Sequence, residues 1–421
     1  MSPPKVLFVC YGGGHAAMVA PVVQALVNEA PDVRVEVMGP TTARGILTRA
    51  GIPFFGYSDI LDPAADAEAY AQGARLAAGH HAPHTGIPEQ ETQAYLGQNY
   101  VELIAEEGTE AAAARFAAMG RRAFLPMTMM ARVIDQMAPD LVVTTPSPRS
   151  ELAARRVAAA RGIPSLVIAD IIGAPGFPPN EMIADHITVP AASAAKGYDR
   201  YDYVRAGQYH VTGNPAMDAL AVSVRPDRAE ARAALGLPGV GQAVLLAEPA
   251  ARLDAAAAVV PLGEAERMAL LSRQHRAVRA AGAVTVIRPH PSLDPGPYAA
   301  FADTVPDAVL AAEAPLMTVL STVDLVVSNS STLMMDALHA GVTVLQTRFP
   351  DSAVSLPFDD MGFALGTPID DEAALTSAMK TALSDADAAA ARLERFRADF
   401  PPPPAAPRIA ALVRAILEGR V

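Results

Sequence analysis

Several short segments of this 421-residue chain are apolar at every position, without the polar alternation of a strand that has one face in water. Sequence with the composition of helices separates them. Strands that are apolar on both faces belong to parallel sheets, which helices cover on two sides through right-handed crossovers. The sequence therefore predicts a doubly wound α/β protein, with strands at residues 6–9, 33–38, 141–143, 165–168, 243–247, 284–287, 325–328 and 342–345.

The predicted strands fall into two series, which divide near Pro215. Proline lacks an amide proton and restricts the residue before it, so it tends to end an element. We predict one doubly wound domain over residues 1–215, a second over residues 216–404, and a ligand cleft where they meet. Helical sequence without a strand signal at about residues 61–139 is predicted to be an insertion. Residues 405–421, behind four consecutive prolines, are predicted to form an amphipathic C-terminal helix.

The composition excludes several classes of protein. With 51% hydrophobic and 19% charged residues, the chain is neither disordered nor a coiled coil. A formal net charge of −12 argues against nucleic acid or an anionic membrane as a partner. The single cysteine, Cys10, excludes an intrachain disulfide and fits a reducing compartment. Because the first apolar run is too short for a signal peptide or a membrane span, we expect a cytoplasmic protein.

Three glycines and a histidine follow the first predicted strand. Gly13, Gly14 and His15 open the first predicted helix, where a doubly wound fold turns backbone N–H groups toward a ligand. We therefore assign both glycines to diphosphate binding, although the spacing matches neither a Walker loop nor the dinucleotide fingerprint and glycines also make simple turns. The helix dipole favours a neutral imidazole at this position, so His15 is a candidate general base.

A run of helix-capping residues occupies the corresponding place in the second half. Ser330, Ser331 and Thr332 lie between a predicted strand and a helix that stops at Gly341. Such residues cap the helix and also let its free N–H groups hold a phosphate, and the run exceeds what one N-cap needs. Asp336, about one turn into the helix, is predicted to accept hydrogen bonds from ribose hydroxyls, the alternative being a solvated carboxylate.

A cation and an imidazole follow the strand predicted at residues 284–287. Arg288 is suited to a phosphate oxygen, and the prolines on both sides of His290 stiffen the loop. Ligands bind at the carboxyl edge of such sheets, so we predict that both side chains contact the ligand, although a lone loop histidine is often structural. The histidine tract at residues 80–84 has no acidic or cysteine partner at ligand spacing, so no metal site is expected there.

Residues 329–345 resemble the nucleotide-binding signature of GT-B glycosyltransferases. The likeness is nearest to the peptidoglycan lipid-linked GlcNAc transferase, in which a helix carboxylate five residues before a glycine holds the ribose of UDP. Asp336 has that spacing. The glycine loop with His15 resembles the glycine-rich loop of the same family. Residues 211–220 and 288–291 resemble segments of the UDP-GlcNAc 2-epimerases, which share the GT-B fold.

The resemblance implies two Rossmann-like domains that face a cleft and a nucleoside-diphosphate sugar, expected to be UDP-linked, as the donor substrate. It implies transfer of the sugar to an acceptor hydroxyl bound by the first domain, without a metal ion or a separate cofactor. Arg288 or His290 would hold the diphosphate together with the capping residues, and His15, or failing that Asp170, would accept the proton of the acceptor. The sugar would be contacted by the loop after the strand at residues 342–345, through Arg348, Asp351 and Ser352.

Two other functions stay open. An isomerase or hydrolase like UDP-GlcNAc 2-epimerase fits the same fold. However, the stretch that aligns with the acidic catalytic residues of the epimerases offers only Asp170 and Glu181, and Glu248 with its neighbours replaces their His-Arg-Arg-Glu-Asn motif. A non-catalytic nucleotide-sugar-binding protein would need Asp336 but not His15. The acceptor, whether a small molecule, a glycan or a lipid-linked group, and a homo-oligomeric state also stay open.

Overall fold

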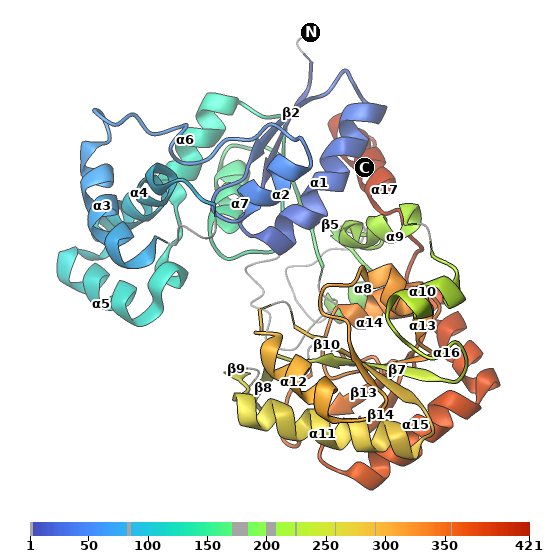
Figure 1. Cartoon of the computed structure of the whole chain (residues 1–421). Coiled ribbons are helices and arrows are strands. Elements are labelled where there is room, and N and C mark those ends of the chain that lie inside the picture. The colour runs from blue at the N-terminus through green and yellow to red at the C-terminus, as the bar shows by residue number, and fades with distance from the viewer. Residues whose placement is uncertain are drawn as a thin grey trace. The chain divides into compact units, whose positions relative to one another are not determined.

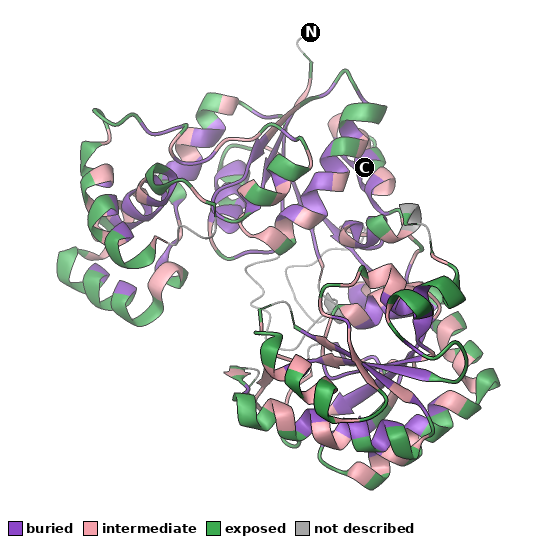
Figure 2. Ribbon diagram, viewed as in Figure 1, coloured by how far each residue is buried: buried purple, intermediate pink, exposed green. Residues whose placement is uncertain are grey.

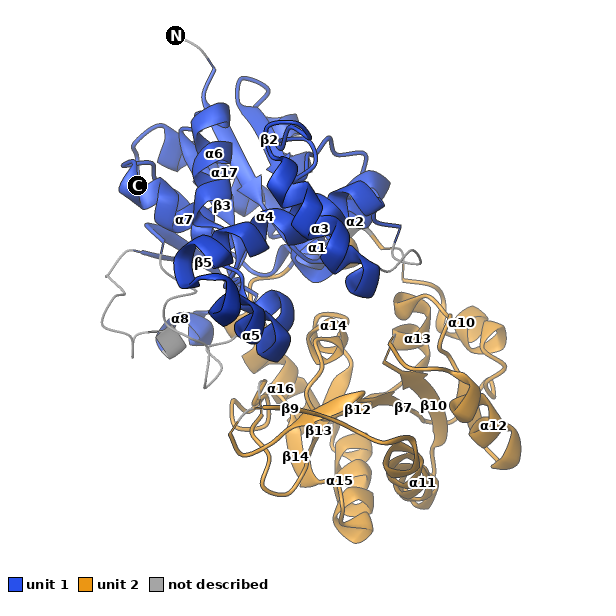
Figure 3. Ribbon diagram, turned by 90° about the vertical axis from the view of Figure 1, so that its left-hand side faces the viewer, with its two compact units in different colours: residues 1–173, 177–218, 403–421 blue, residues 174–176, 219–402 orange. Residues whose placement is uncertain are grey.

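The chain forms two compact units, which Figure 3 shows in different colours. The computed structural model describes residues 3–81, 86–170, 184–198, 208–223, 225–256, 258–290, 292–354 and 356–421. The first unit contains the described residues up to Asp218 together with Pro403–Val421, and the second contains those of Ala219–Pro402. Asp218 belongs to the first unit because its carboxylate accepts hydrogen bonds from the N–H groups of Ala405 and Ala406, at 2.5 and 2.7 Å. The sequence-based boundary at Pro215 lies just before this point.

The first unit is built on a six-stranded parallel sheet in the order β2-β1-β3-β4-β5-β6 (Figure 1). The strands are β1 (Lys5–Val9), β2 (Arg34–Met38), β3 (Leu141–Thr144), β4 (Ser165–Ile168), β5 (His186–Val189) and β6 (Tyr209–Val211). The first four match the sequence prediction. The last two were missed because β5 begins with His186 and β6 is three residues long with His210 at its centre, so neither shows an apolar run.

The second unit has its own six-stranded parallel sheet, in the order β11-β10-β7-β12-β13-β14. The strands are β7 (Ala243–Glu248), β10 (Val284–Pro289), β11 (Ala308–Leu310), β12 (Leu325–Ser328), β13 (Thr343–Arg348) and β14 (Leu365–Pro368). The four central strands were predicted. The edge strands β11 and β14 are short and only partly buried, and they give no clear apolar signal. A small antiparallel pair, β8 (Ala251–Leu253) and β9 (Val259–Pro261), follows β7.

Helices connect the strands in both units, so the predicted doubly wound α/β class is confirmed. In the first unit they are α1 (Gly13–Glu29), α2 (Ala43–Arg49), α3 (Ala67–His80), α4 (Glu89–Glu107), α5 (Thr109–Met119), the 3-10 turn η2 (Gly120–Ala123), α6 (Met127–Met137), α7 (Ser150–Ala160), α8 (Ala192–Tyr198), the 3-10 turn η4 (Pro215–Met217) and α17 (Ala406–Leu417). Helix α9 (Asp218–Val222) crosses the boundary between the units. The second unit has α10 (Arg228–Ala234), α11 (Glu264–Ala280), α12 (Gly296–Thr304), α13 (Leu316–Thr322), α14 (Leu333–His339), α15 (Glu372–Ser384) and α16 (Ala386–Asp399).

Successive residues of β1 point into two different apolar cores. Val6 and Phe8 pack with α1 and α17 on one face of the sheet. Leu7 and Val9 pack with α4, α6 and α7 on the other face. Figure 2 shows the strands buried between these layers. Burial on both faces explains why the strand sequence shows no polar alternation.

The segment predicted to be an insertion, about residues 61–139, holds α3 to α6 and no strand among its described residues. Helices α3 and α4 approach so closely that only glycine fits at two positions. A Cβ atom on Gly73 would lie 2.0 Å from the carbonyl oxygen of Gln93, and one on Gly97 would lie 1.7 Å from that of Ala69. Within the ranges listed above, no helix has the length and apolar character needed to cross a membrane.

The C-terminal helix α17 returns to the first unit and packs on α1 (Figure 1). Its apolar stripe, predicted from the sequence, is buried in the same core as Val6 and Phe8. The side chain of Ile409 is fully buried there, whereas Ala411 on the same helix is exposed. The last residues of the chain therefore complete the core that lies behind the first glycine loop.

Truncating Ile409 tests this packing. Replacing a fully buried isoleucine by alanine removes apolar contacts and leaves a cavity, so Ile409→Ala should lower the free energy of unfolding by about 2–5 kcal/mol. Urea-induced unfolding followed by circular dichroism measures the change. The control Ala411→Ser should change it by less than about 0.5 kcal/mol. Equal stability of the two variants would show that α17 does not contribute to the core.

Candidate functional site

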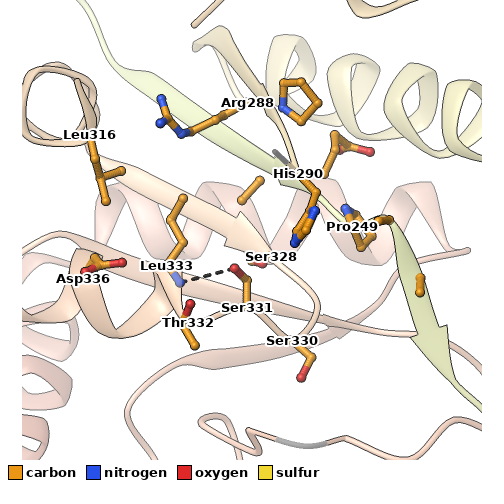
Figure 4. Close-up of a pocket in the computed structure, with 15 residues that line it drawn as sticks. Pro249, Arg288, His290, Leu316, Ser328, Ser330, Ser331, Thr332, Leu333 and Asp336 are labelled. Carbon is orange, nitrogen blue, oxygen red and sulfur yellow. Dashed lines mark hydrogen bonds between the residues drawn. The ribbon is translucent and has the colours of Figure 1, made fainter. Parts of the chain in front are cut away.

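The second unit contains a pocket of about 660 Å³ at the carboxyl edge of its sheet (Figure 4). Its walls come from the ends of β7, β10 and β12, from the loop before α14 and from the first turn of that helix. The structure brings together here all the polar residues that the sequence predicted for this half as diphosphate or ribose contacts. They are Arg288, His290, Ser330, Ser331, Thr332 and Asp336.

The hydroxyl residues before α14 have different surroundings. The Ser331 Oγ atom accepts a hydrogen bond from the N–H of Leu333 at 3.2 Å, as in helix capping (Figure 4). Thr332 is the N-cap residue, and its side chain makes no capping hydrogen bond. The capping alternative therefore accounts for Ser331, while the exposed Thr332 lines the pocket without that role.

Arg288 is held rigidly at the end of β10. Its Nη1 group donates hydrogen bonds to the carbonyl oxygens of Ala311 and Ala314, both at 2.8 Å. The Nε and Nη2 groups have no hydrogen-bond partner among the described residues, so the guanidinium keeps donors for a ligand. Burial lowers the pKa of Arg288, and the charges of Glu313 and Asp336 oppose this change.

Asp336 lies in the first turn of α14 with its carboxylate in the wall of the pocket. Burial raises its pKa to about 6, against the opposing charge of Arg288. The carboxylate is therefore mostly ionised at neutral pH and accepts hydrogen bonds only. This chemistry fits a pair of hydroxyl groups better than it fits an anion.

Glu248, the last residue of β7, was not predicted to be a site residue, yet it also lines the pocket. It is 3% exposed. Its Oε1 atom accepts a hydrogen bond from Gln274 at 2.8 Å, and Oε2 has no partner among the described residues. Burial raises the pKa of Glu248 to about 8. The sequence signal was a carboxyl group directly at the end of an apolar strand.

The three residues predicted to contact the donor sugar are not among those that line this pocket. Arg348 forms ion pairs with Asp359 and Asp360. Its hydrogen bonds to Asp359 raise the pKa of the Arg348 guanidinium. Asp351 has a left-handed backbone with φ 52°. The Ser352 Oγ atom lies 3.5 Å from Nη1 of Arg252. These three residues therefore lie outside the wall of this pocket, and their contact with a sugar stays a prediction.

In the first unit, His15 lies beside a buried carboxylate that the sequence analysis missed. The Nδ1 atom of His15 lies 3.5 Å from Oε1 of Glu151, the second residue of α7. The side chain of Glu151 is fully buried, and its Oε1 atom also accepts the N–H of Tyr11 at 2.8 Å. Its Oε2 atom has no partner within the described part of the chain. Oδ1 of Asp170, two residues after the end of β4, is likewise buried without a partner among the described residues.

The surroundings of His15 oppose the prediction that the start of the helix keeps the imidazole neutral. Burial lowers its pKa, but the hydrogen bond and the charge of Glu151, together with the charge of Asp170, raise the pKa above its ordinary value. Burial also raises the pKa of Asp170. His15 is therefore a stronger base than a free histidine, which suits proton abstraction. The charges of Glu151 and Asp170 act in the direction opposite to that expected of a helix start, and no local sequence pattern reveals them.

The glycine loop before α1 is open. A Cβ atom on Gly12 or Gly14 would meet no atom within 4 Å, and neither glycine has a positive φ. The backbone at these two positions therefore does not require glycine, and the space beside them is open. The N–H of Gly13 already donates to Oγ1 of Thr42 at 3.2 Å, so that group is not free for a diphosphate.

Aromatic and basic groups surround this part of the first unit. The Arg149 guanidinium lies 4.2 Å above the ring of Tyr11, and the rings of Tyr11 and Tyr95 are 5.5 Å apart. Nε of Arg149 is buried without a hydrogen-bond partner among the described residues. Sequence reasoning had no signal for these contacts, since they depend on the packing of α4 and α7 beside β1.

No group of three histidine, cysteine or acidic side chains in the described ranges is placed to hold a metal ion. The histidine tract at residues 80–84 has other contacts: His80 packs edge-on against Phe116, and Nδ1 of His81 lies 3.1 Å from Oγ1 of Thr92. His84, Glu181 and Pro291, which the sequence analysis considered, lie outside the described residues.

The pair formed by His15 and Glu151 makes a testable prediction. The pKa of His15 should lie above 6.5 in the parent protein and fall in Glu151→Gln, because burial then acts without the neighbouring charge. NMR titration of the imidazole, assigned with His15→Gln, measures both values. Glu110→Gln, an exposed change on α5, is the control and should leave the titration unchanged. An unaltered pKa in Glu151→Gln would contradict the pairing.

The sequence matches no family model and no curated protein. The structure, however, matches solved structures over almost the whole of both chains. A UDP-GlcNAc 2-epimerase from Neisseria meningitidis bound to UDP-GlcNAc is 15% identical, with a TM-score of 0.61 over 98% of this chain and 100% of the other. The glycotransferase of kitacinnamycin is 14% identical, with a TM-score of 0.60 over 99% of each chain. MurG of Acinetobacter baumannii is 14% identical, with a TM-score of 0.58 over 98% and 99%. The chain therefore has the GT-B fold.

Proposed function

We propose that this chain is a metal-independent glycosyltransferase that moves a sugar from a nucleoside-diphosphate sugar, with UDP as the nucleotide, to an acceptor hydroxyl. One observation carries the proposal: a single pocket of the second unit collects Arg288, His290, the hydroxyl run before α14 and Asp336. Its volume of about 660 Å³ is in the range of small-molecule sites. Nucleotide sugars are bound by structural relatives, such as the epimerase solved with UDP-GlcNAc.

The basic side chains of the pocket suit a diphosphate. Arg288 keeps Nε and Nη2 for phosphate oxygens, since its bonds to the chain use Nη1. Nδ1 of His290 accepts the N–H of Ser292 at 3.2 Å and lies 2.7 Å from the Oγ atom of the same residue. With the ring proton on Nε2, that N–H donates to a second phosphate oxygen. These donors stabilise the charge that grows on the diphosphate as it leaves.

Asp336 suits the ribose. Its carboxylate accepts hydrogen bonds and carries a charge that would repel a phosphate, so it must face the hydroxyl end of the nucleotide. The ionised form at neutral pH makes stronger hydrogen bonds than a neutral acid does. This assignment gives the nucleotide an orientation, with the diphosphate toward Arg288 and the ribose toward α14.

His15 and Glu151 supply the proton transfer. His15 takes the proton of the acceptor hydroxyl while the oxygen attacks the anomeric carbon and the nucleoside diphosphate departs. Glu151 orients the ring and stabilises the imidazolium that forms, as a buried carboxylate does in other acid–base pairs.

A 2-epimerase or hydrolase is the second candidate, supported by the full-length likeness to the epimerase. Product analysis separates the candidates. With UDP-GlcNAc alone, an epimerase yields its C2 epimer and a hydrolase yields free sugar, whereas a transferase leaves the donor intact until an acceptor is added. A binding protein without activity leaves it intact in every mixture. Assays contain EDTA, because the proposed chemistry needs no metal ion.

The ribose assignment predicts that Asp336→Ala weakens the binding of UDP. Losing a hydrogen bond to a charged group costs about 1.5–3 kcal/mol, so the dissociation constant should rise by about 10- to 100-fold. Isothermal titration calorimetry measures it. Glu394→Ala, at an exposed position of α16, should bind UDP as the parent does. Parent-like affinity in Asp336→Ala would refute the assignment.

The general-base assignment predicts that His15→Ala lowers turnover by about 10²–10⁴-fold. The affinity for UDP should be unchanged, because the proposed nucleotide pocket is made of residues from the second unit. The melting temperature should change little, since His15 is only partly buried. A lower melting temperature with turnover per folded molecule preserved would show that His15 has a structural role only, and would turn attention to Asp170.

A further inference from the structure

The loop between β2 and α2 contains a residue in an unfavourable backbone conformation. Thr41 has a left-handed φ of 57° and is 5% exposed. Among the described non-glycine residues with a positive φ, it is the only one with a β-branched side chain. The left-handed region is a genuine outlier for such side chains, so contacts with the surrounding structure must hold Thr41 there.

The hydroxyl group of Thr41 joins this loop to the glycine loop after β1. Its Oγ1 atom donates a hydrogen bond to the carbonyl oxygen of Tyr11 at 2.7 Å. The next residue, Thr42, accepts the N–H of Gly13 at its own Oγ1 atom, 3.2 Å away. Strands β1 and β2 are parallel neighbours, so the loops that follow them leave the same edge of the sheet and can hold each other.

On its other side, the glycine loop is tied to the acid–base pair. The N–H of Tyr11 donates to Oε1 of Glu151 at 2.8 Å, and the same oxygen lies 3.5 Å from Nδ1 of His15. Tyr11 is therefore held through its N–H by Glu151 and through its C=O by Thr41. Gly12 adds no packing, since a Cβ atom there would meet no atom within 4 Å. Hydrogen bonds must therefore fix the path of the backbone from β1 to His15.

We propose that Thr41 is a positioning residue, whose hydroxyl group holds the glycine loop so that the imidazole of His15 stays beside Glu151. The inference rests on the general-base role proposed above and adds the residue that fixes the place of the base. The left-handed backbone brings the hydroxyl within hydrogen-bonding distance of the Tyr11 carbonyl, and the fold keeps this conformation despite its cost. Such precision matters to a base, because a displacement of about 1 Å can lower a rate by about 100-fold.

Three variants test the role of the hydroxyl group. Thr41→Val keeps the shape and the β-branching of the side chain but has no donor, whereas Thr41→Ser keeps the donor. Thr48→Val, the same change at an exposed position of α2, is the matched control. NMR titration of His15 reports its pairing with Glu151. Release of UDP from UDP-N-acetylglucosamine, under the acceptor conditions in which the parent turns over, gives kcat.

In Thr41→Val the pKa of His15 should fall toward its value in Glu151→Gln, because the ring loses its alignment with that carboxylate. The charges of Asp170 and Arg149, which also act on His15, are unaltered in these variants. The kcat should fall by about 3- to 30-fold. The affinity for UDP should be unchanged, because the proposed nucleotide pocket belongs to the second unit. The other two variants should match the parent in all three measurements.

An unchanged titration of His15 in Thr41→Val would overturn the proposal, even if the variant had a lower melting temperature, since the hydroxyl would then only stabilise the fold. A shifted titration with parent-like turnover per folded molecule would overturn it as well, and so would a Thr41→Ser variant that behaves like Thr41→Val. A parent that turns over the donor in no mixture would refute the proposed function. The titration would still decide whether Thr41 positions His15.

Discussion

Burial of both faces of the central strands is the constraint on which the rest of the structure depends. Since side chains of β1, β7 and β12 lie against apolar cores above and below the sheet, polar groups are excluded from the middle of the strands. They gather where the strands end. Because the strands of each sheet are parallel, these ends meet along one edge, and Glu248, Arg288 and Ser328 thus share one pocket.

The same burial determines the electrostatics of the two sites. Removal from water raises the pKa of Asp336 and of Glu248, to different extents, so two carboxyl groups in one pocket are in different protonation states at neutral pH. In the first unit, Glu151 raises the pKa of His15 against the effect of burial. One carboxyl oxygen of Glu248 and one of Glu151 are buried without a hydrogen-bond partner among the described residues, which is unfavourable for folding.

Sequence reasoning predicted those features of the fold and of the site that a local sequence pattern determines. The continuous apolar strands predicted the two parallel sheets, and the family resemblance of residues 329–345 and of the glycine loop implied the GT-B fold. The residues that follow the strands include most of the polar side chains of the pocket in the second unit. Glu151 was missed because it lies 136 residues from His15, and only the packing of α7 brings them together. In the same way, only the packing of α11 on the sheet brings Gln274 to the carboxyl group of Glu248. The ion pair of Arg348 with Asp359 is likewise a product of the fold that no spacing rule reveals.

A crystal structure of the protein with UDP tests the central claim most directly. The account predicts that the diphosphate lies within hydrogen-bonding distance of the Arg288 guanidinium. It also predicts that the ribose hydroxyls lie on the carboxylate of Asp336, with no metal ion between the phosphates and the protein. A nucleotide bound only to residues of the first unit, or bound in the second unit away from this pocket, would contradict the account.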